Sequence, residues 1–361
     1  MHRPILPALL SCSGTRLTDA EKIFFARCNP LGINLFGRNI ENKTQIKNLV
    51  QEIKDTIGRD DVLIAIDQEG GRVRRLKEPE FRSYAAAIDI GTLPPAHAAR
   101  AAELHAALIA ADLAELGINV NYAPVLDLIY PQTSPALKSR CFSADEILTA
   151  ALGRCEVEAF IKGGIAPCIK HMPGHGRASV DPHLKLPRLE QGLNELQKDF
   201  HPFKELNDSP LGMTAHIVLA AVDDTAPITQ SKKAIDTVIR GEIGFNGLLI
   251  SDAIDMKALA GTPGEKASAA VRAGCDAVCY ALGNLSEMED IAAALAPMSD
   301  KSLERFAKAA KIIHTKPHRQ PWQKLSAEYQ ELAGSIPPYQ ETYDATEVLN
   351  QLLKDKTNKG D

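Results

Sequence analysis

The sequence lacks the features that mark membrane and nucleic-acid-binding proteins. It has a single Trp, and aromatic residues make up only 5% of its 361 residues. No apolar run approaches the roughly 20 residues that a membrane-spanning helix needs. The formal net charge is −5, and no block of Lys or Arg is long enough to neutralise many phosphates. We therefore expect no membrane partner and no nucleic-acid partner.

The cysteine pattern excludes two further classes. There are seven Cys, an odd number, and no CxxC pair. This pattern argues against a disulfide framework and against a zinc knuckle. The apolar stretch from Ile5 to Cys12 follows Arg3, but it is too short for a signal peptide and contains Pro7. We expect this stretch to be a first core strand and the protein to be cytoplasmic.

What the sequence does contain is a regular alternation of short apolar runs and helix-like stretches. The apolar runs have the length and composition of strands that are buried on both faces of a parallel sheet. They cover residues 7–11, 32–36, 62–67, 119–122, 166–171, 212–216, 247–252 and 276–280. The helix-like stretches cover residues 18–27, 42–57, 96–116, 144–162, 231–239, 267–273 and 285–295.

About eight such alternations predict an α/β fold, a (β/α)8 TIM-type barrel over residues 1–300. A doubly wound sheet is the runner-up, although the sequence has neither GxGxxG after the first strand nor GxxxxGK[ST] anywhere. Residues 301–361 are too few for a core of their own. We expect them to form a helical extension packed on the barrel, with helices at 302–314 and near 342–353 and a frayed tail.

In such a barrel, side chains at the carboxyl ends of the strands meet at one mouth. The strand ends nominate six residues for this mouth. They are Asp67, Asp127, Lys170, His171, His216 and Asp252. Asp252 follows the apolar Gly-Leu-Leu-Ile-Ser run, so we expect it to face the cavity. Asp255 is the better candidate for the N-cap of the next helix.

The loop after the fifth strand is the densest in reactive side chains. Residues 170–183 hold three His, one Lys, one Arg and one Asp, and their Gly and Pro exclude a regular helix. In Asp181-Pro182-His183, an extended backbone places the Asp and His on the same face. The carboxylate can then fix the imidazole tautomer and raise its basicity, which suits proton transfer.

A second dense segment runs from Asp67 to Arg75. Asp67 could accept hydrogen bonds from paired sugar hydroxyls. Arg72, Arg74 and Arg75 could bind anions or sugar oxygens, but we expect some of them to form only a solvated face. Arg140 is a lone basic residue with little signal of its own.

An acid, a His–Asp pair and several cations in one cavity suit glycosidic hydrolysis, where a retaining enzyme needs both an acid and a carboxylate below the anomeric carbon. A metal site is the alternative, because His171 and His175 have the HxxxH spacing. Pro173 and Gly174 between them prevent a helix, so we expect His175 to brace the loop instead.

Taken together, these motifs resemble glycoside hydrolase family 3, in its β-N-acetylhexosaminidase branch. The resemblance extends over roughly residues 5–300. Five segments carry it: Ile66–Arg72, Asn121–Asp127, Lys170–Gly176, Asp181–His183 and Gly247–Asp252. The chain departs from the family at Pro182, where Ser is usual, at Met172, where Phe is common, and at Ala253, where an acid is frequent.

The resemblance implies a role for each matching residue. Asp252 matches the nucleophile, which forms a covalent glycosyl-enzyme, and His183 matches the acid/base with Asp181 as its partner. The residues that match the sugar-binding positions are Asp67, Arg75, Arg140, Lys170 and His171. No metal and no cofactor are implied.

The implied activity is exo-cleavage of terminal N-acetylglucosamine from cell-wall fragments, in which this sugar is linked to 1,6-anhydro-N-acetylmuramic acid with or without peptide. Two rivals stay open. One is a metal-dependent hydrolase that uses His171, His175, His183 and Asp252 as ligands, and the other is a catalytically silent sugar-binding barrel. Phosphorolysis in place of hydrolysis also stays open, and the sequence does not indicate an oligomeric state.

Overall fold

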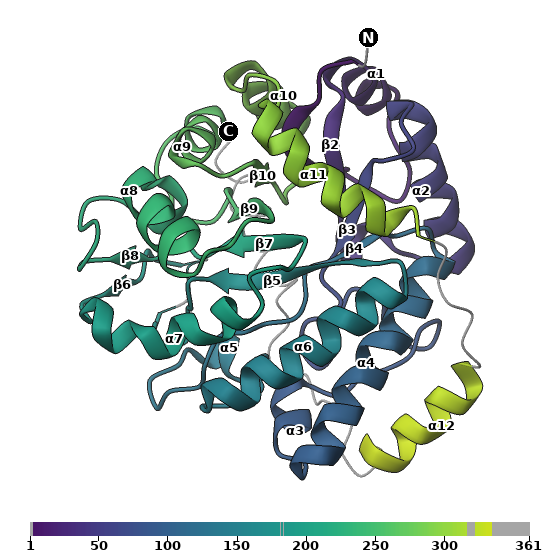
Figure 1. The fold of residues 1–361 in the computed structure, drawn as a ribbon. Coiled ribbons are helices and arrows are strands. Elements are labelled where there is room, and N and C mark those ends of the chain that lie inside the picture. Colours follow the sequence, from purple (N-terminus) through teal and green to yellow (C-terminus); the bar gives the residue numbers. More distant parts are fainter. Residues whose placement is uncertain (1–2, 181, 183, 316–321, 334–361) are drawn as a thin grey trace.

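The computed structural model describes residues 3–180, 182, 184–315 and 322–333. Eight parallel strands close into a barrel in the order β1-β10-β9-β7-β5-β4-β3-β2 (Figure 1). They are β1 Leu6–Ser11, β2 Pro30–Leu35, β3 Leu63–Ile66, β4 Val120–Asn121, β5 Ala166–Met172, β7 Leu211–Thr214, β9 Leu248–Ala253 and β10 Ala277–Cys279. Each corresponds to one of the eight apolar runs, so the predicted barrel is confirmed and the doubly wound sheet is wrong.

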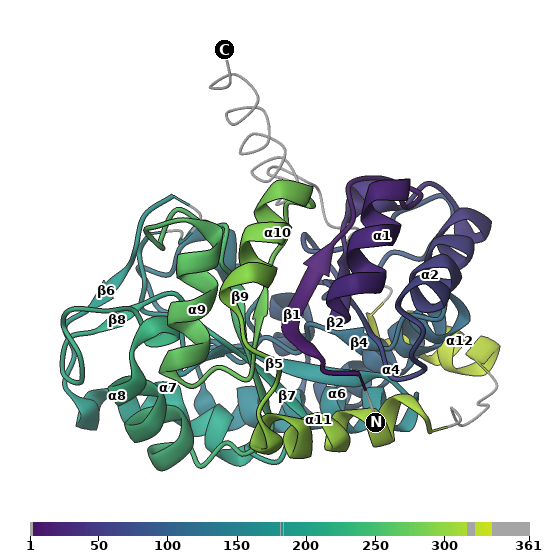
Figure 2. The same ribbon diagram turned by 90° about the horizontal axis from the view of Figure 1, so that it is seen from above.

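Helices surround the strands, as Figure 2 shows from above. The longer ones are α1 Asp19–Cys28, α2 Lys43–Ile57, α4 Pro95–Glu115, α6 Glu146–Lys162, α7 Leu193–Glu205, α9 Pro263–Ala273 and α10 Leu285–Ala294. Between β7 and β9 lie the short α8 Lys232–Ala234 and a π-helical stretch, Ile235–Glu242. The smaller elements are α3 Ala87–Gly91, α5 Pro135–Lys138, two 3-10 turns at Gly37–Asn39 and Ile228–Gln230, and the paired strands β6 Arg188–Leu189 and β8 Val218–Leu219.

Two helices differ from the sequence-based expectations. No helix was predicted at α7, because its interior Pro202 is a helix-breaking signal, although Leu196, Phe200 and Phe203 form a buried face. The predicted N-cap at Asp255 is wrong. The next helix, α9, begins only at Pro263, where Thr262 makes a reciprocal capping box with Glu265.

The amino ends of the strands are covered by α11, Asp300–Ile313, which corresponds to the helix predicted at 302–314. Figure 2 shows α11 running across this end of the barrel. Its Phe306 and Ala309 share one apolar cluster with interior residues such as Leu9 and Leu63. Because the apolar face of α11 closes this end, a site inside the barrel has to open at the carboxyl ends of the strands.

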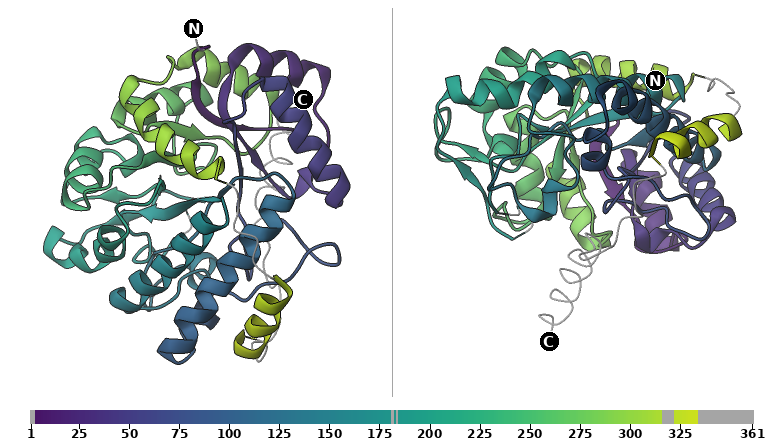
Figure 3. Two further views of the ribbon diagram at one scale, coloured as in Figure 1. Left: turned by 45° about the vertical axis from the view of Figure 1, so that its right-hand side comes forward. Right: turned by 90° about the horizontal axis from the view of Figure 1, so that it is seen from below.

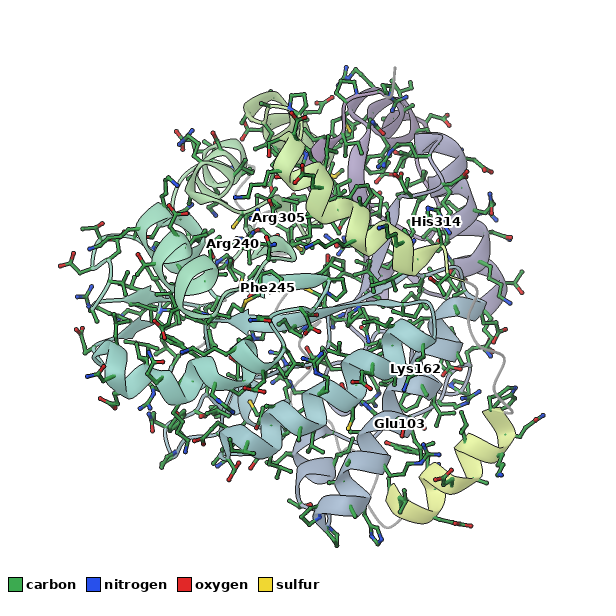
Figure 4. All side chains as sticks on the ribbon, viewed as in Figure 1. Glu103, Lys162, Arg240, Phe245, Arg305 and His314 are labelled. Carbon is green, nitrogen blue, oxygen red and sulfur yellow. The ribbon has the colours of Figure 1, made fainter. Side chains whose placement is uncertain are left out.

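A charged cluster fastens α11 to the barrel. Asp276 accepts hydrogen bonds from Arg305 and Ser302 of α11, each at 2.8 Å, and from Arg240 at 2.8 Å. Figure 4 shows Arg240 and Arg305 on neighbouring elements at this end of the molecule. Because Asp276, Arg305 and Ser302 are all buried, the cluster forms part of the packed interior.

The last described helix, α12 Trp322–Ala333, lies beside α4 on the outside of the barrel (Figure 3). Arg100 of α4 pairs with Glu328 through two hydrogen bonds of 2.7 and 2.8 Å. The helix predicted near 342–353 lies outside the described residues. Across the described ranges, no helix combines the length and apolarity needed to cross a membrane.

Candidate active site

A pocket opens at the carboxyl end of the barrel and collects the residues that the sequence nominated. Six of the eight predicted site residues line it. They are Asp67, Arg75, Arg140, Lys170, His171 and Asp252. The other two, Asp181 and His183, lie outside the described residues. Pro182 lines the same pocket, and its carbonyl accepts a hydrogen bond of 3.2 Å from Ala258.

Asp67 lies just after β3 and is held by two cations. Its carboxylate accepts a hydrogen bond from Lys170 Nζ at 2.8 Å and one from Arg75 Nη2 at 3.2 Å. Burial alone would raise the pKa of Asp67, but Lys170 and Arg75 outweigh burial and hold this pKa well below its usual range. The carboxylate is therefore ionised and can accept further hydrogen bonds from sugar hydroxyls.

Glu69, for which the sequence predicted no role, completes the charge cluster. Its Oε1 lies 2.6 Å from Lys170 Nζ and 2.7 Å from Arg140 Nη2, and its Oε2 accepts from Arg140 Nε at 2.8 Å. Burial would raise the pKa of Glu69, but Arg140 and Lys170 lower it to about 2. Lys170 Nζ thus bridges two carboxylates, and Arg140 is fixed by a two-pronged pair.

The ring of His171 is oriented by Asp127, the nominated residue in the segment that follows the fourth apolar run. Asp127 Oδ2 lies 2.6 Å from His171 Nδ1, and its Oδ1 accepts from the His175 backbone N–H at 2.5 Å. Asp127 is fully buried, and an ionised carboxylate can only accept hydrogen bonds. His171 Nδ1 therefore carries the proton in this contact. His171 Nε2 then faces the pocket beside Arg140 Nη2, at 3.4 Å.

Asp252 is the penultimate residue of β9 and is partly exposed to the pocket, as the sequence predicts. Its Oδ1 accepts a hydrogen bond of 2.8 Å from the Ala253 N–H. His216, also nominated, lies behind this backbone and not in the pocket lining. Its Nε2 is 3.0 Å from the Ala253 carbonyl and its Nδ1 is 2.8 Å from Thr229 Oγ1.

Two expectations about neighbouring polar residues are corrected. Arg72, Arg74 and Arg75 are all buried, so none of them forms a solvated face. They turn inward because Gly70 and Gly71, both with positive φ, fold the chain back after β3. Asp255 caps no helix, as described above. It lines the pocket and accepts a 2.8 Å hydrogen bond from the Ala281 N–H.

The pocket is suited to binding a polyhydroxylated ligand. It combines charged donors and acceptors at one side with apolar lining such as Phe36, Met213 and Cys279. Within the described ranges, no group of three or more His, Cys, Asp or Glu side chains is placed to hold a metal ion. His183, a ligand in the metal alternative, lies outside those ranges.

Comparison with known proteins gives a consistent result. The model of the glycosyl hydrolase family 3 N-terminal domain matches residues 13–313. A Beta-hexosaminidase of Chromobacterium violaceum is 35% identical over 338 residues, which cover 91% of this chain and 92% of the relative. A second Beta-hexosaminidase, from Bordetella avium, is 35% identical over 280 residues, 75% of this chain and 79% of the relative.

The solved structures agree. The crystal structure of NagZ from Neisseria gonorrhoeae in complex with N-trifluoroacetyl-D-glucosamine superimposes with a TM-score of 0.82 at 30% identity. The match covers 93% of this chain and 99% of that chain. The residues matched by the family model, 13–313, include every residue that lines the pocket.

Proposed function

Because this chain belongs to glycosyl hydrolase family 3, as an enzyme of the β-hexosaminidase type, we propose that it is a retaining exo-β-N-acetylglucosaminidase. Its substrates are cell-wall fragments with a terminal N-acetylglucosamine on 1,6-anhydro-N-acetylmuramic acid, with or without peptide. The observation that carries the proposal is that Asp252 shares one pocket with the cluster of Asp67, Lys170 and Arg140.

The charge cluster binds the sugar. Asp67 and Arg75 offer an acceptor and a donor to neighbouring hydroxyls, while Lys170 and Arg140 are held in place by Glu69. His171 contributes Nε2 because Asp127 fixes its ring. These groups are positioned before the ligand arrives, so little side-chain freedom is lost on binding. A related protein, NagZ from Neisseria gonorrhoeae, binds an N-acylated glucosamine, the class of sugar proposed here.

The bond is cleaved in two steps. In the first, Asp252 attacks the anomeric carbon, the glycosidic C–O bond breaks, and His183 gives its proton to the leaving oxygen. In the second, the now neutral His183 takes a proton from water, and this water releases the sugar from Asp252 with net retention. Asp181 stabilises the charged form of His183 in the first step and keeps its ring oriented.

We place the reaction in cell-wall recycling in the cytoplasm. The seven cysteines are all unpaired, which is typical of proteins in a reducing compartment. The chain needs no cofactor in this mechanism, because the proton donor, the proton acceptor and the nucleophile are all side chains.

The test is hydrolysis of para-nitrophenyl β-N-acetylglucosaminide beside the matching β-glucoside, with and without EDTA. Cleavage of the N-acetyl substrate alone, unchanged by EDTA, supports the proposal. Loss of activity in EDTA would contradict it in favour of a metal-dependent hydrolase. The disaccharide N-acetylglucosaminyl-1,6-anhydro-N-acetylmuramic acid is assayed in parallel, in phosphate and in phosphate-free buffer. No cleavage of any of the three would indicate a silent sugar-binding barrel, and a sugar 1-phosphate product would indicate phosphorolysis.

A further inference from the structure

His175 presents an imidazole ring to the pocket without a partner for either ring nitrogen. The side chain lines the pocket and is 5% exposed. Among the residues that the structure describes, neither Nδ1 nor Nε2 has a hydrogen-bond partner. Buried polar groups are rarely left in this state, because an unmade hydrogen bond costs stability. Both nitrogens are buried, and the ring that carries them lines the pocket, so this combination points to a partner that arrives with the ligand.

The position of the ring is fixed by the backbone and not by its own nitrogens. Asp127 Oδ1 accepts from the His175 N–H at 2.5 Å, and Ala178 N–H donates to the His175 carbonyl at 3.0 Å. The His171 ring lies beside it, with 6.0 Å between the ring centroids. The next residue, Gly176, packs so closely on the Leu128 carbonyl that any side chain there would collide with it. The loop therefore holds the ring in place before ligand binds.

The surroundings of His175 keep its ring uncharged. Burial is the main cause that lowers the pKa of His175, to about 4, and His171 and Arg140 lower this pKa further. Asp127 and Asp252 act in the opposite direction, but they do not overcome burial. At neutral pH the ring therefore carries one N–H donor and one bare nitrogen acceptor.

We propose that His175 is a substrate-binding residue that hydrogen-bonds, through its neutral ring, to a polar substituent of the sugar held at Asp252. The inference rests on the proposed function, because it takes Asp252 to mark the position of the anomeric carbon. Sugar hydroxyl and acetamido groups both donate and accept, as the neutral ring does. A charged ring here would attract the Asp252 carboxylate and weaken it as a nucleophile. A neutral ring can bind the sugar without forming an ion pair with Asp252.

Two variants separate this role from simple packing. His175→Gln keeps one donor and one acceptor, and His175→Phe fills the space without either. With para-nitrophenyl β-N-acetylglucosaminide, we expect His175→Phe to lose about ten- to a hundred-fold in kcat/KM, as for the loss of one or two buried hydrogen bonds. His175→Gln should lose no more than about three-fold. The control is His314→Phe, on the exposed end of α11 and away from the pocket, which should behave as wild type.

A binding measurement on the unaltered protein guards against variants that fail to fold. The ring nitrogens are observed by NMR of protein labelled with 15N-histidine, with the His175 signals assigned by their loss in His175→Gln. Addition of N-acetylglucosamine should shift these signals saturably. Wild-type turnover with no such shift, and His175→Phe within about two-fold of wild type, would overturn the inference alone. An inactive wild type would instead count against the proposed function.

Discussion

Arg140 and Glu69 form a two-pronged ion pair beneath the pocket, with Nε to Oε2 at 2.8 Å and Nη2 to Oε1 at 2.7 Å. The same Oε1 lies 2.6 Å from Lys170 Nζ. One buried carboxylate therefore orients two of the cations that we propose to bind the sugar. Glu69 itself does not line the pocket, so we expect it to act by positioning Arg140 and Lys170.

Replacing Glu69 by Gln tests this positioning role. The change removes the charge that opposes two buried cations, and breaking a buried ion pair at one side costs about 3–5 kcal/mol of stability. We expect lower thermal stability and a KM raised by about ten-fold or more, with a smaller change in kcat, since the groups that react are untouched. Steady-state kinetics and thermal unfolding measure both effects.

The matched control is Glu190→Gln, which breaks the exposed pair with Arg188. Exposed pairs contribute about 0–1 kcal/mol, so neither stability nor KM should change appreciably. If Glu69→Gln behaved like this control, Glu69 would have no positioning role.

The stability of the enzyme should fall in acid because of the same cluster. Burial would raise the pKa of Glu69, but Arg140 and Lys170 lower it to about 2, below the ordinary value of ~4.3. The contribution of Glu69 to the free energy of unfolding is thus fully present at pH values above its ordinary pKa. It is lost as the pH falls toward 2. Urea unfolding at a series of pH values between 7 and 3 should show a steeper decline for wild type than for Glu69→Gln. Equal slopes for the two proteins would contradict the assignment.

His183→Ala should affect substrates according to their leaving groups. A phenolic leaving group departs with little help from a proton, whereas a sugar hydroxyl needs one. We expect kcat/KM to fall more for the disaccharide than for the para-nitrophenyl substrate, by a factor of about 100. Parallel assays of the two substrates measure the ratio, and equal losses would argue against His183 as the acid.

Asp276→Asn should weaken the fold without altering the site. Asp276 accepts from Arg240 and Arg305, each at 2.8 Å, at the end of the barrel opposite the pocket. The substitution leaves two largely buried guanidinium groups without the negative charge of Asp276. We therefore expect a loss of about 3 kcal/mol in the free energy of unfolding. The kcat/KM of the folded enzyme should stay within about two-fold.

Asp236→Asn is the control for this change, since Asp236 of the π-helical stretch forms an exposed pair with Lys232 of α8. Its effect on unfolding should be below about 0.5 kcal/mol. A similar small effect for Asp276→Asn would show that the cluster does not fasten α11 to the barrel.

The strands were predictable because each is a local pattern. A short apolar run bounded by polar residues identifies a buried strand within its own sequence, as Gly247–Asp252 does for β9. The end of that run also identified Asp252. The roles of Glu69 and Asp127 were not predictable in this way, because their partners Arg140 and His171 lie 71 and 44 residues further along the chain. The burial of Arg72 and Arg74 was also not predictable, since composition alone does not determine which charged side chains a fold buries.

The central claim is a covalent intermediate on Asp252, and trapping this intermediate tests it most directly. A 5-fluoro-N-acetylglucosaminyl fluoride slows the second step more than the first, so that the glycosyl-enzyme accumulates. Intact-protein mass spectrometry should show the mass of one added sugar, and peptide mapping should place it on Asp252, with none added to Asp252→Ala. Active wild-type enzyme that gains no sugar, or gains it on another residue, would contradict the account.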